Sequence, residues 1–182
     1  MEKIASNTKV LIAALLMLFL LACHKQDTNM KSSAEPTLSP DIYFQGKSYG
    51  VGFVQDRFGK IRRSFTVSLI GDFDESGGTL AEEFHWSDGE IEKRIWTLRK
   101  INENSWKATA PDIIGEATGV IEGNLLKWNY VLKVPIGERR IAMKFDDQMM
   151  LFEDGILVNR ASFSKFGIHL GDVLVSFSKA AL

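Results

Sequence analysis

The sequence is poor in the residues that carry covalent and metal chemistry. It contains one cysteine and three histidines among 182 residues, and only His85 and His169 lie in the body of the chain. A single cysteine excludes an intramolecular disulfide. No G-x-S-x-G motif surrounds any serine, so a serine nucleophile with a histidine base is not expected. No spacing brings the two histidines together as metal ligands. We therefore expect no catalytic residue, no metal site and no cofactor.

The chain also lacks a surplus of basic residues. Its formal net charge at pH 7 is −1, whereas a nucleic-acid-binding surface needs a concentrated positive patch. The short basic pairs Arg62-Arg63 and Arg139-Arg140 are typical of solvated strand ends. The sequence therefore indicates no binding to nucleic acid.

No apolar run is long enough to cross a membrane as a helix. The longest, from Val10 to Ala22, falls short of the roughly 20 residues that a spanning helix needs. Lys3 and Lys9 precede this run and small Ala22 ends it, which is the layout of a secretory signal peptide. The tetrapeptide Leu20-Leu21-Ala22-Cys23 resembles a bacterial lipobox. That resemblance implies cleavage after residue 22 and attachment of acyl chains such as palmitate to Cys23.

The residues from Cys23 onward are typical of a lipidated N-terminus followed by a spacer. His24 stands where an aspartate would, by enterobacterial sorting rules, favour the inner membrane, so we expect the periplasmic face of the outer membrane. The segment 23–40 is polar and has no apolar period, as in a flexible tether. More than one acyl chain is enough for stable anchoring. An ordinary secreted protein and an uncleaved anchor are the alternatives. Residues 41–182 are expected to form a single domain.

The body of the chain alternates apolar and polar residues, which is the pattern of half-buried strands. In the segment 61–73, Ile61, Phe65, Val67, Leu69 and Phe73 share one face. In the same way, apolar residues at alternate positions from Val120 to Val134 are expected to share one face, and so are those from Ile141 to Phe145. Further strands are expected near 43–54, 79–87, 91–101, 106–114, 148–153, 156–165 and 169–178.

Short turn signals separate these predicted strands. Asp88-Gly89 and Asp154-Gly155 are typical of tight hairpins. Sequential hairpins indicate an all-β antiparallel up-and-down meander of about eight to ten strands, closed into a lipocalin-like barrel. Its apolar-in alternation is opposite to that of an outer-membrane pore. An open sandwich is the alternative. The interior of such a barrel is either filled by side chains or holds one small ligand.

Five stretches, in order along the chain, resemble a proteobacterial lipoprotein family known as domain of unknown function 3833. They are DRFGKIRRSF (56–65), SDGEIEKRIW (87–96), DIIGEATGVIEGN (112–124), FDD (145–147) and LVNRASFSKFG (157–167). This resemblance spans about Ile42 to Lys179 and implies export and lipidation without an assigned activity. Members are often encoded beside enzymes that modify membrane fatty acids, which implies a link to that chemistry.

Candidate binding residues follow from strand parity. Four side chains are expected to line the lumen: Trp128, Tyr130, Met143 and Phe145. Four polar residues are further candidates: Arg63, Asn124, Asp147 and Arg160. Because a buried charge needs a partner, we expect Arg63 to pair with Asp147 and Arg160 with Asp146. Such pairs either close one barrel end, or Arg63 contacts a carboxylate or phosphate headgroup while the lumen takes the chain.

Three functions fit these expectations. The leading hypothesis is a membrane-anchored protein, held through Cys23, that binds or carries a fatty acid or other apolar lipid. The second is a non-catalytic envelope protein with a filled barrel whose outer face contacts partner proteins. The third is a lipid-modifying enzyme that uses the acidic residues Asp146 and Asp147.

Overall fold

The computed structural model describes residues 30–181 of the chain. The signal peptide predicted for residues 1–22, the acylation predicted at Cys23 and the first part of the predicted tether lie outside these residues. Within 30–181, no helix has the length and apolar character needed to cross a membrane.

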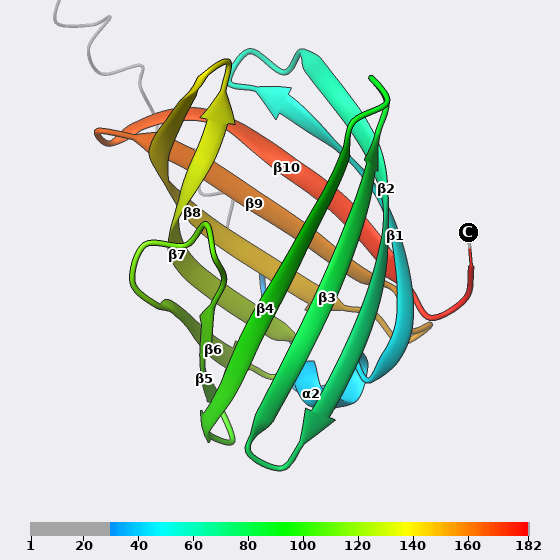
Figure 1. The fold of residues 1–182 in the computed structure, drawn as a ribbon. Coiled ribbons are helices and arrows are strands. Elements are labelled where there is room, and N and C mark those ends of the chain that lie inside the picture. The colour runs from blue at the N-terminus through cyan, green and yellow to red at the C-terminus, as the bar shows by residue number, and fades with distance from the viewer. Residues whose placement is uncertain (1–29, 182) are drawn as a thin grey trace, which may run out of the picture.

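Ten antiparallel strands form a closed barrel (Figure 1). In chain order they are β1 (Gly46–Asp56), β2 (Ile61–Asp74), β3 (Gly77–Trp86), β4 (Ile91–Asn102), β5 (Ser105–Thr109), β6 (Ala117–Glu122), β7 (Leu125–Ile136), β8 (Arg139–Leu151), β9 (Leu157–Lys165) and β10 (Ile168–Ser178). Each strand pairs with its neighbours in sequence, and β1 pairs with β10 to close the sheet. Pairing of β1 with β10 removes the two edges that an open meander would leave. The predicted up-and-down lipocalin-like barrel is confirmed, and the open sandwich is excluded.

Alternate side chains of the strands point into the barrel, as the sequence pattern predicted. In β2, Phe65, Val67 and Leu69 are buried while the residues between them are exposed. The expectation that Val120 shares a face with the residues of β7 was wrong, because a turn at Gly123 separates β6 from β7 and leaves Val120 47% exposed. The separate strand predicted near 148–153 is instead the end of β8.

The two ends of the barrel differ in how they are covered. Helix α2 (Pro40–Tyr43) lies across one end, the closed end (Figure 1). Leu38, Tyr43 and Phe44 are buried there against the strand residues of the core. The opposite end carries the turns 57–60, 87–90, 137–138 and 166–167, and we call it the mouth. The core is therefore sealed at one end only.

Residues 30–38 are held against the barrel by hydrogen bonds. The Ser33 amide donates to Asn124 Oδ1 over 2.8 Å, and the Asn124 amide donates to the Ser33 carbonyl. The Leu38 amide donates to the carbonyl of Gly123. A side chain on Gly123 would collide with Ser33, since its Cβ would lie 1.9 Å from the Ser33 carbonyl oxygen. The sequence predicted spacer as far as Pro40, whereas a hydrogen bond to the barrel is already present at residue 30, the first residue that the structure describes.

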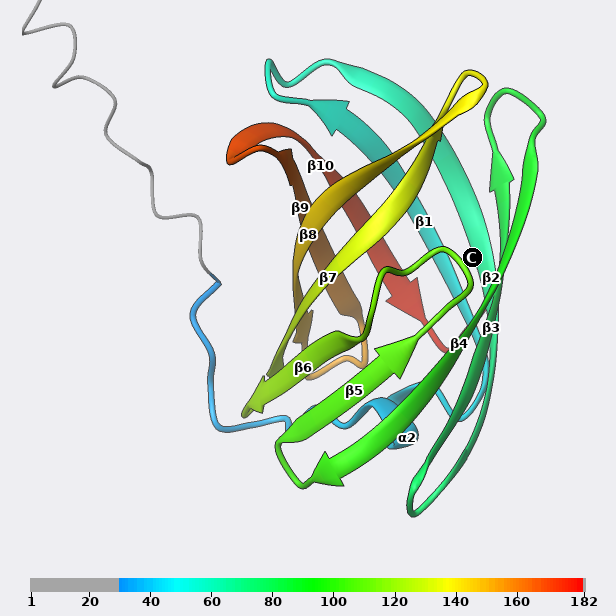
Figure 2. The same ribbon diagram turned by 60° about the vertical axis from the view of Figure 1, so that its left-hand side comes forward.

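The sheet is interrupted near the mouth between β4 and β7. Strands β5 and β6 are short, so β5 pairs with residues 97–102 of β4 and β6 with residues 125–129 of β7. The β5–β6 connection occupies the remaining space (Figure 2). There the Ile114 amide donates to the Val131 carbonyl, and the Lys133 amide donates to the Asp112 carbonyl. Among the described residues, 91–96 of β4 have no strand partner on the side away from β3.

Candidate functional site

The half of the barrel nearer the mouth encloses an apolar cavity of about 320 Å³. This volume lies in the range of roughly 300–1,000 Å³ that small-molecule sites occupy. The wall is largely aromatic and aliphatic, and includes Phe84, Trp86, Trp96, Leu132, Met143, Phe145, Phe163 and Val175. Ile136 also lines the cavity and is 49% exposed beside the β7–β8 turn. The cavity therefore reaches the mouth.

A smaller cavity of about 100 Å³ lies deeper, toward the closed end. Leu98, Trp128 and Met149 line it, and its floor is formed by Pro40 of α2 and by Phe44, which follows α2. The two cavities share a partition of five lining residues: Glu82, Trp96, Tyr130, Asn159 and Phe177. The two cavities are therefore neighbours along the lumen, with this partition between them.

Stacked rings form much of the cavity wall. The Trp96 and Tyr130 ring centroids lie 5.6 Å apart in an edge-to-face contact. Tyr130 stacks on Phe145 at 5.2 Å, and Phe145 stacks on Phe163 at 5.6 Å. Edge-to-face and stacked pairs of this kind contribute about 0.5–1.5 kcal/mol each beyond the area that they bury. The rings therefore stabilise the wall that they form.

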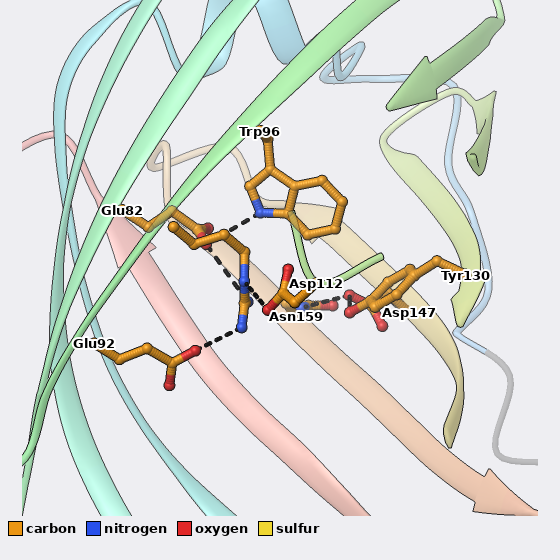
Figure 3. Close-up of polar contacts among 8 residues, drawn as sticks. Glu82, Glu92, Trp96, Asp112, Tyr130, Asp147 and Asn159 are labelled. Carbon is orange, nitrogen blue, oxygen red and sulfur yellow. Dashed lines mark hydrogen bonds and ion pairs between the residues drawn. The ribbon is translucent and has the colours of Figure 1, made fainter. Parts of the chain in front are cut away.

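A mostly buried arginine lines the larger cavity, beside the gap between β4 and β7. Figure 3 shows the carboxylates of Glu82, Glu92 and Asp112 gathered around one guanidinium, that of Arg94. Arg94 Nη2 donates to Glu92 over 2.7 Å, Nε donates to Asp112 over 3.0 Å, and Glu82 lies 3.8 Å from Nη1. Trp96 Nε1 also donates to Glu82, over 3.1 Å. We call these four charged residues the Arg94 cluster.

The Arg94 cluster carries more negative than positive charge. Burial by itself lowers the pKa of Arg94, but the three carboxylates outweigh it, and the pKa of Arg94 is raised. Burial raises the pKa of Glu82, and Arg94 opposes this only in part. Arg94 therefore stays charged, and a ligand carboxylate that approached it would meet three carboxylates already in place.

A second polar group lies nearby in the lumen (Figure 3). The Tyr130 hydroxyl donates to Asp147 Oδ2 over 3.2 Å, and Asn159 Nδ2 donates to the same oxygen over 3.4 Å. Burial raises the pKa of Asp147 to about 7, and the hydrogen bonds from Asn159 and Tyr130 oppose the rise. Within the described chain, Oδ1 of Asp147 and Oδ1 of Asn159 have no hydrogen-bond partner. Two acceptors of this group are therefore buried without a donor among residues 30–181.

Four of the predicted binding residues lie in the lumen. Met143 and Phe145 line the larger cavity, Trp128 lines the smaller one, and Tyr130 lies between the two. Asp147 is buried beside Tyr130. Asp146, its neighbour in sequence, points outward and pairs with Lys144, since successive side chains of a strand face opposite sides. The acidic pair of the enzyme hypothesis is therefore divided by the sheet.

The two predicted arginine pairs are wrong. Arg63 lies at the mouth end of β2, where it pairs with Asp88 and Glu90 at 2.7 and 2.8 Å and lies 4.1 Å above the Trp86 ring. The acidic β3–β4 turn is closer to Arg63 along the rim than Asp147, which lies on β8.

Arg160 and Asn124 also lie away from the lumen. Arg160 alternates with the buried Asn159 and Ala161, so it points outward, and it pairs with Asp172 on β10 at 3.1 Å instead of Asp146. Asn124 lies at the closed end, where Nδ2 donates to the Leu151 carbonyl and Oδ1 accepts the Ser33 amide. Its side chain holds the N-terminal segment in place.

The Arg94 cluster is not predictable from strand parity, because the apolar residues of β4 suggest the wrong inward face. Ile91 and Ile95 share one face of β4, yet both are 57% exposed, whereas Glu92 and Arg94 point inward. One available signal was Glu82, an acid at a position whose strand neighbours of the same parity are Leu80 and Phe84. A charged residue in an apolar row predicts a buried partner.

The histidines do not form a metal site in the described chain. His85 is exposed and lies 2.8 Å from Glu83, and His169 is exposed and lies 3.3 Å from Asp172. Within residues 30–181, no group of three or more histidine, cysteine, aspartate or glutamate side chains is arranged to hold a metal ion.

The closed barrel is similar in fold to a solved structure. The S-type phycobiliprotein lyase from Guillardia theta superimposes with a TM-score of 0.56 at 8% sequence identity, over 78% of this chain and 90% of the lyase. At this identity the likeness concerns the fold. No curated protein matches the sequence. A family model described as a protein of unknown function, DUF3833, matches residues 17–179. The chain therefore belongs to the DUF3833 family, and its structure is a ten-stranded lipocalin-like barrel.

Proposed function

We propose that this protein is an envelope lipoprotein whose barrel binds an acyl-chain lipid, with the chain in the aromatic cavity and the polar headgroup at the mouth. The observation that carries the proposal is the apolar cavity of about 320 Å³ that reaches the mouth at Ile136. Burial of apolar chain surface supplies roughly 25 cal/mol per Å². A wall of rings and aliphatic side chains suits a flexible apolar chain better than a polar substrate.

The Arg94 cluster restricts which end of the lipid enters. Arg94 already faces three carboxylates, so a free carboxylate or phosphate at this depth would add repulsion. The lipid therefore enters chain first. A lipid whose carboxyl group is esterified or otherwise neutral binds better than one whose free carboxylate enters the cavity. The sequence-based hypothesis has the same orientation but assigns the headgroup to Arg63. Arg63 is paired with Asp88 and Glu90.

Native mass spectrometry of the protein extracted from membranes under mild conditions tests the binding. The wild-type chain should carry one lipid. Ala161 is 4% exposed and lines the cavity, so Ala161→Phe fills the cavity and should abolish the lipid adduct. Ala81→Phe is the matched control, because Ala81 lies on β3 between the inward-facing Leu80 and Glu82 and so points outward.

Two results would contradict the proposal. One is a wild-type protein that never carries lipid from several extractions. The other is an Ala161→Phe variant that folds and keeps the lipid. Should Ala161→Phe not fold, Ala161→Leu occupies less of the cavity and should lower the lipid occupancy in part.

The anchoring through Cys23 has its own test. The intact mass of the membrane-extracted protein should equal that of residues 23–182 plus a diacylglycerol and one further acyl chain. Cys23→Ala should remove this added mass. A mature chain that begins at Cys23 with a free thiol would contradict the anchor, and it would leave lipid binding in the lumen unaffected.

A further inference from the structure

Three turns that are neighbours around the mouth expose large apolar side chains. Phe58 in the β1–β2 turn is 79% exposed, Phe166 in the β9–β10 turn is 91% exposed, and Ile136 beside the β7–β8 turn is 49% exposed. The strand order β2–β1–β10–β9–β8–β7 places these turns along one continuous part of the rim, which we call the basic arc. Large apolar side chains gathered on a surface mark a site of contact.

Phe166 is exposed although its backbone is unfavourable for phenylalanine. Its φ is +52°, in the left-handed region that glycine adopts without steric cost. The ring contributes no core packing at 91% exposure. Turn geometry and core packing therefore give no reason for an aromatic residue here, whereas contact with an apolar environment does.

Cations accompany these apolar side chains. The Arg57 guanidinium and the Lys165 ammonium each lie 4.7 Å from the ring centroid of the adjacent phenylalanine. Lys60, Arg139 and Arg140 are exposed on the same turns. The acidic residues beside these turns are Asp56, which pairs with Arg62, and Glu138, which is exposed. The basic arc therefore has a net positive charge, while the acidic β3–β4 turn lies outside it.

We propose that the basic arc docks onto an anionic phospholipid surface, with Phe58, Phe166 and Ile136 inserted among the headgroups. Basic side chains beside exposed aromatic ones are the combination that interfacial membrane segments use. Each lysine or arginine near an anionic surface strengthens binding roughly fivefold. A folded partner protein is the other class of occupant. The repeated cation beside each phenylalanine favours lipid, since the cations complement phosphate while the rings enter the apolar layer.

The position of the N-terminal segment agrees with this orientation. The Met30 amide donates to Gln148 Oε1 on β8, nine residues from the mouth end of that strand at Arg139. Nine strand residues tilted at about 40° rise roughly 23 Å along a barrel axis. Six residues lie between Cys23 and Met30, so the two are seven steps apart along the chain, and seven extended steps span up to about 25 Å. An acyl anchor on Cys23 can therefore lie in the same membrane as the basic arc.

Docking in this way would turn the opening of the cavity toward the membrane. That consequence rests on the proposed lipid-binding function, but the docking itself does not. A lipid would then move between the bilayer and the lumen without its chain crossing water.

Photocrosslinking in intact cells tests the docking on the full chain. A benzoylphenylalanine introduced at Phe58 or Phe166 should form adducts with the mass of a phospholipid. The same substitution at Phe152, in the β8–β9 turn at the closed end and 46% exposed, is the matched control and should form several-fold fewer.

The dependence on charge gives a second readout. Lys60→Glu should lower the yield of phospholipid adduct at Phe58 by about fivefold or more. Lys47→Glu, near the closed end at the start of β1, should leave the yield unchanged. Adducts at Phe58 and Phe166 with a protein would overturn the proposal in favour of a protein partner. Equal yields at Phe58, Phe166 and Phe152 would also overturn it. So would a yield at Phe58 that Lys60→Glu does not change.

Discussion

The closed end and the mouth of this barrel are built from the same ten strands but on different principles. At the closed end the interior is filled except for the smaller cavity of about 100 Å³, and Leu38, Leu69 and Leu157 are no more than 1% exposed. Toward the mouth the interior holds a cavity, and charged residues replace aliphatic ones at Glu82 and Arg94. One sheet thus has a half that is packed for stability and a half that is left open.

The difference shows where a small barrel can accommodate a site. Burial of aliphatic side chains at the closed end contributes roughly 25 cal/mol per Å² of apolar surface removed from water. A buried ion cluster contributes little net stability, because the desolvation of its charges offsets their attraction. The mouth half is therefore the part of the structure whose composition is explained better by binding than by folding.

The largest expected effect concerns packing. Leu157→Ala, at the closed end and in the wall of neither cavity, should lower the free energy of unfolding by about 3–5 kcal/mol. Met143→Ala should cost only about 2 kcal/mol, at the low end for such substitutions, since the Met143 side chain already borders a cavity. Urea denaturation measures both values. Equal losses would show that the two halves do not differ in packing.

Removal of the buried arginine should also destabilise the fold, by about 3 kcal/mol for Arg94→Leu at pH 7, because Glu82 and Asp112 lose their partner. The loss should shrink as the pH is lowered and the carboxylates gain protons. Glu82→Gln is the control, and it should be neutral or stabilising because burial raises the pKa of Glu82. A destabilisation by Glu82→Gln as large as that of Arg94→Leu would contradict this account.

The pH dependence of stability should report on Asp147. Burial raises its pKa from 3.8 to about 7, so between these values the folded state holds a proton that the unfolded state releases. Its contribution to the free energy of unfolding therefore falls as the pH rises from about 4 to about 7. Asp147→Asn should remove this contribution and raise stability by about 2 kcal/mol at pH 8 but not at pH 4.

The outward neighbour of Asp147 supplies the control for that measurement. Asp146→Asn removes a charge from an exposed pair with Lys144 and should leave the pH profile as in the wild type. If both variants shift the profile alike, the effect does not come from burial in the lumen.

The smallest expected effect is at the tip of the mouth. Phe58→Ser should change the free energy of unfolding by no more than about 0.5 kcal/mol, because the Phe58 side chain is 79% exposed. A loss of several kcal/mol in urea denaturation would show that Phe58 packs against the barrel, and it would remove the reason for assigning the ring to a membrane contact.

Strand parity predicted the fold and the apolar wall from the sequence but could not predict the polar partners. The alternation placed Phe65 and Val67 inside the barrel, and it placed Tyr130 and Met143 in the lumen. Parity says which face a side chain takes but does not say which strand lies opposite or where along the axis.

The arginines illustrate that limit. Arg63 was assigned to Asp147 although the acidic β3–β4 turn lies closer, and Arg160 pairs across one hairpin with Asp172. The Arg94 cluster depends on the interruption between β4 and β7, which admits Asp112 from the β5–β6 connection. No local sequence pattern encodes that interruption.

Methyl NMR of the methionines tests lipid binding in the mouth half most directly. Met143 lines the larger cavity, Met149 lines the smaller one, and Met150 alternates with it and points outward. When phospholipid is added, the Met143 methyl should shift and show nuclear Overhauser contacts to acyl methylenes, while Met150 should not change. A Met143 methyl that shows neither shift nor contact at saturating lipid would contradict the account.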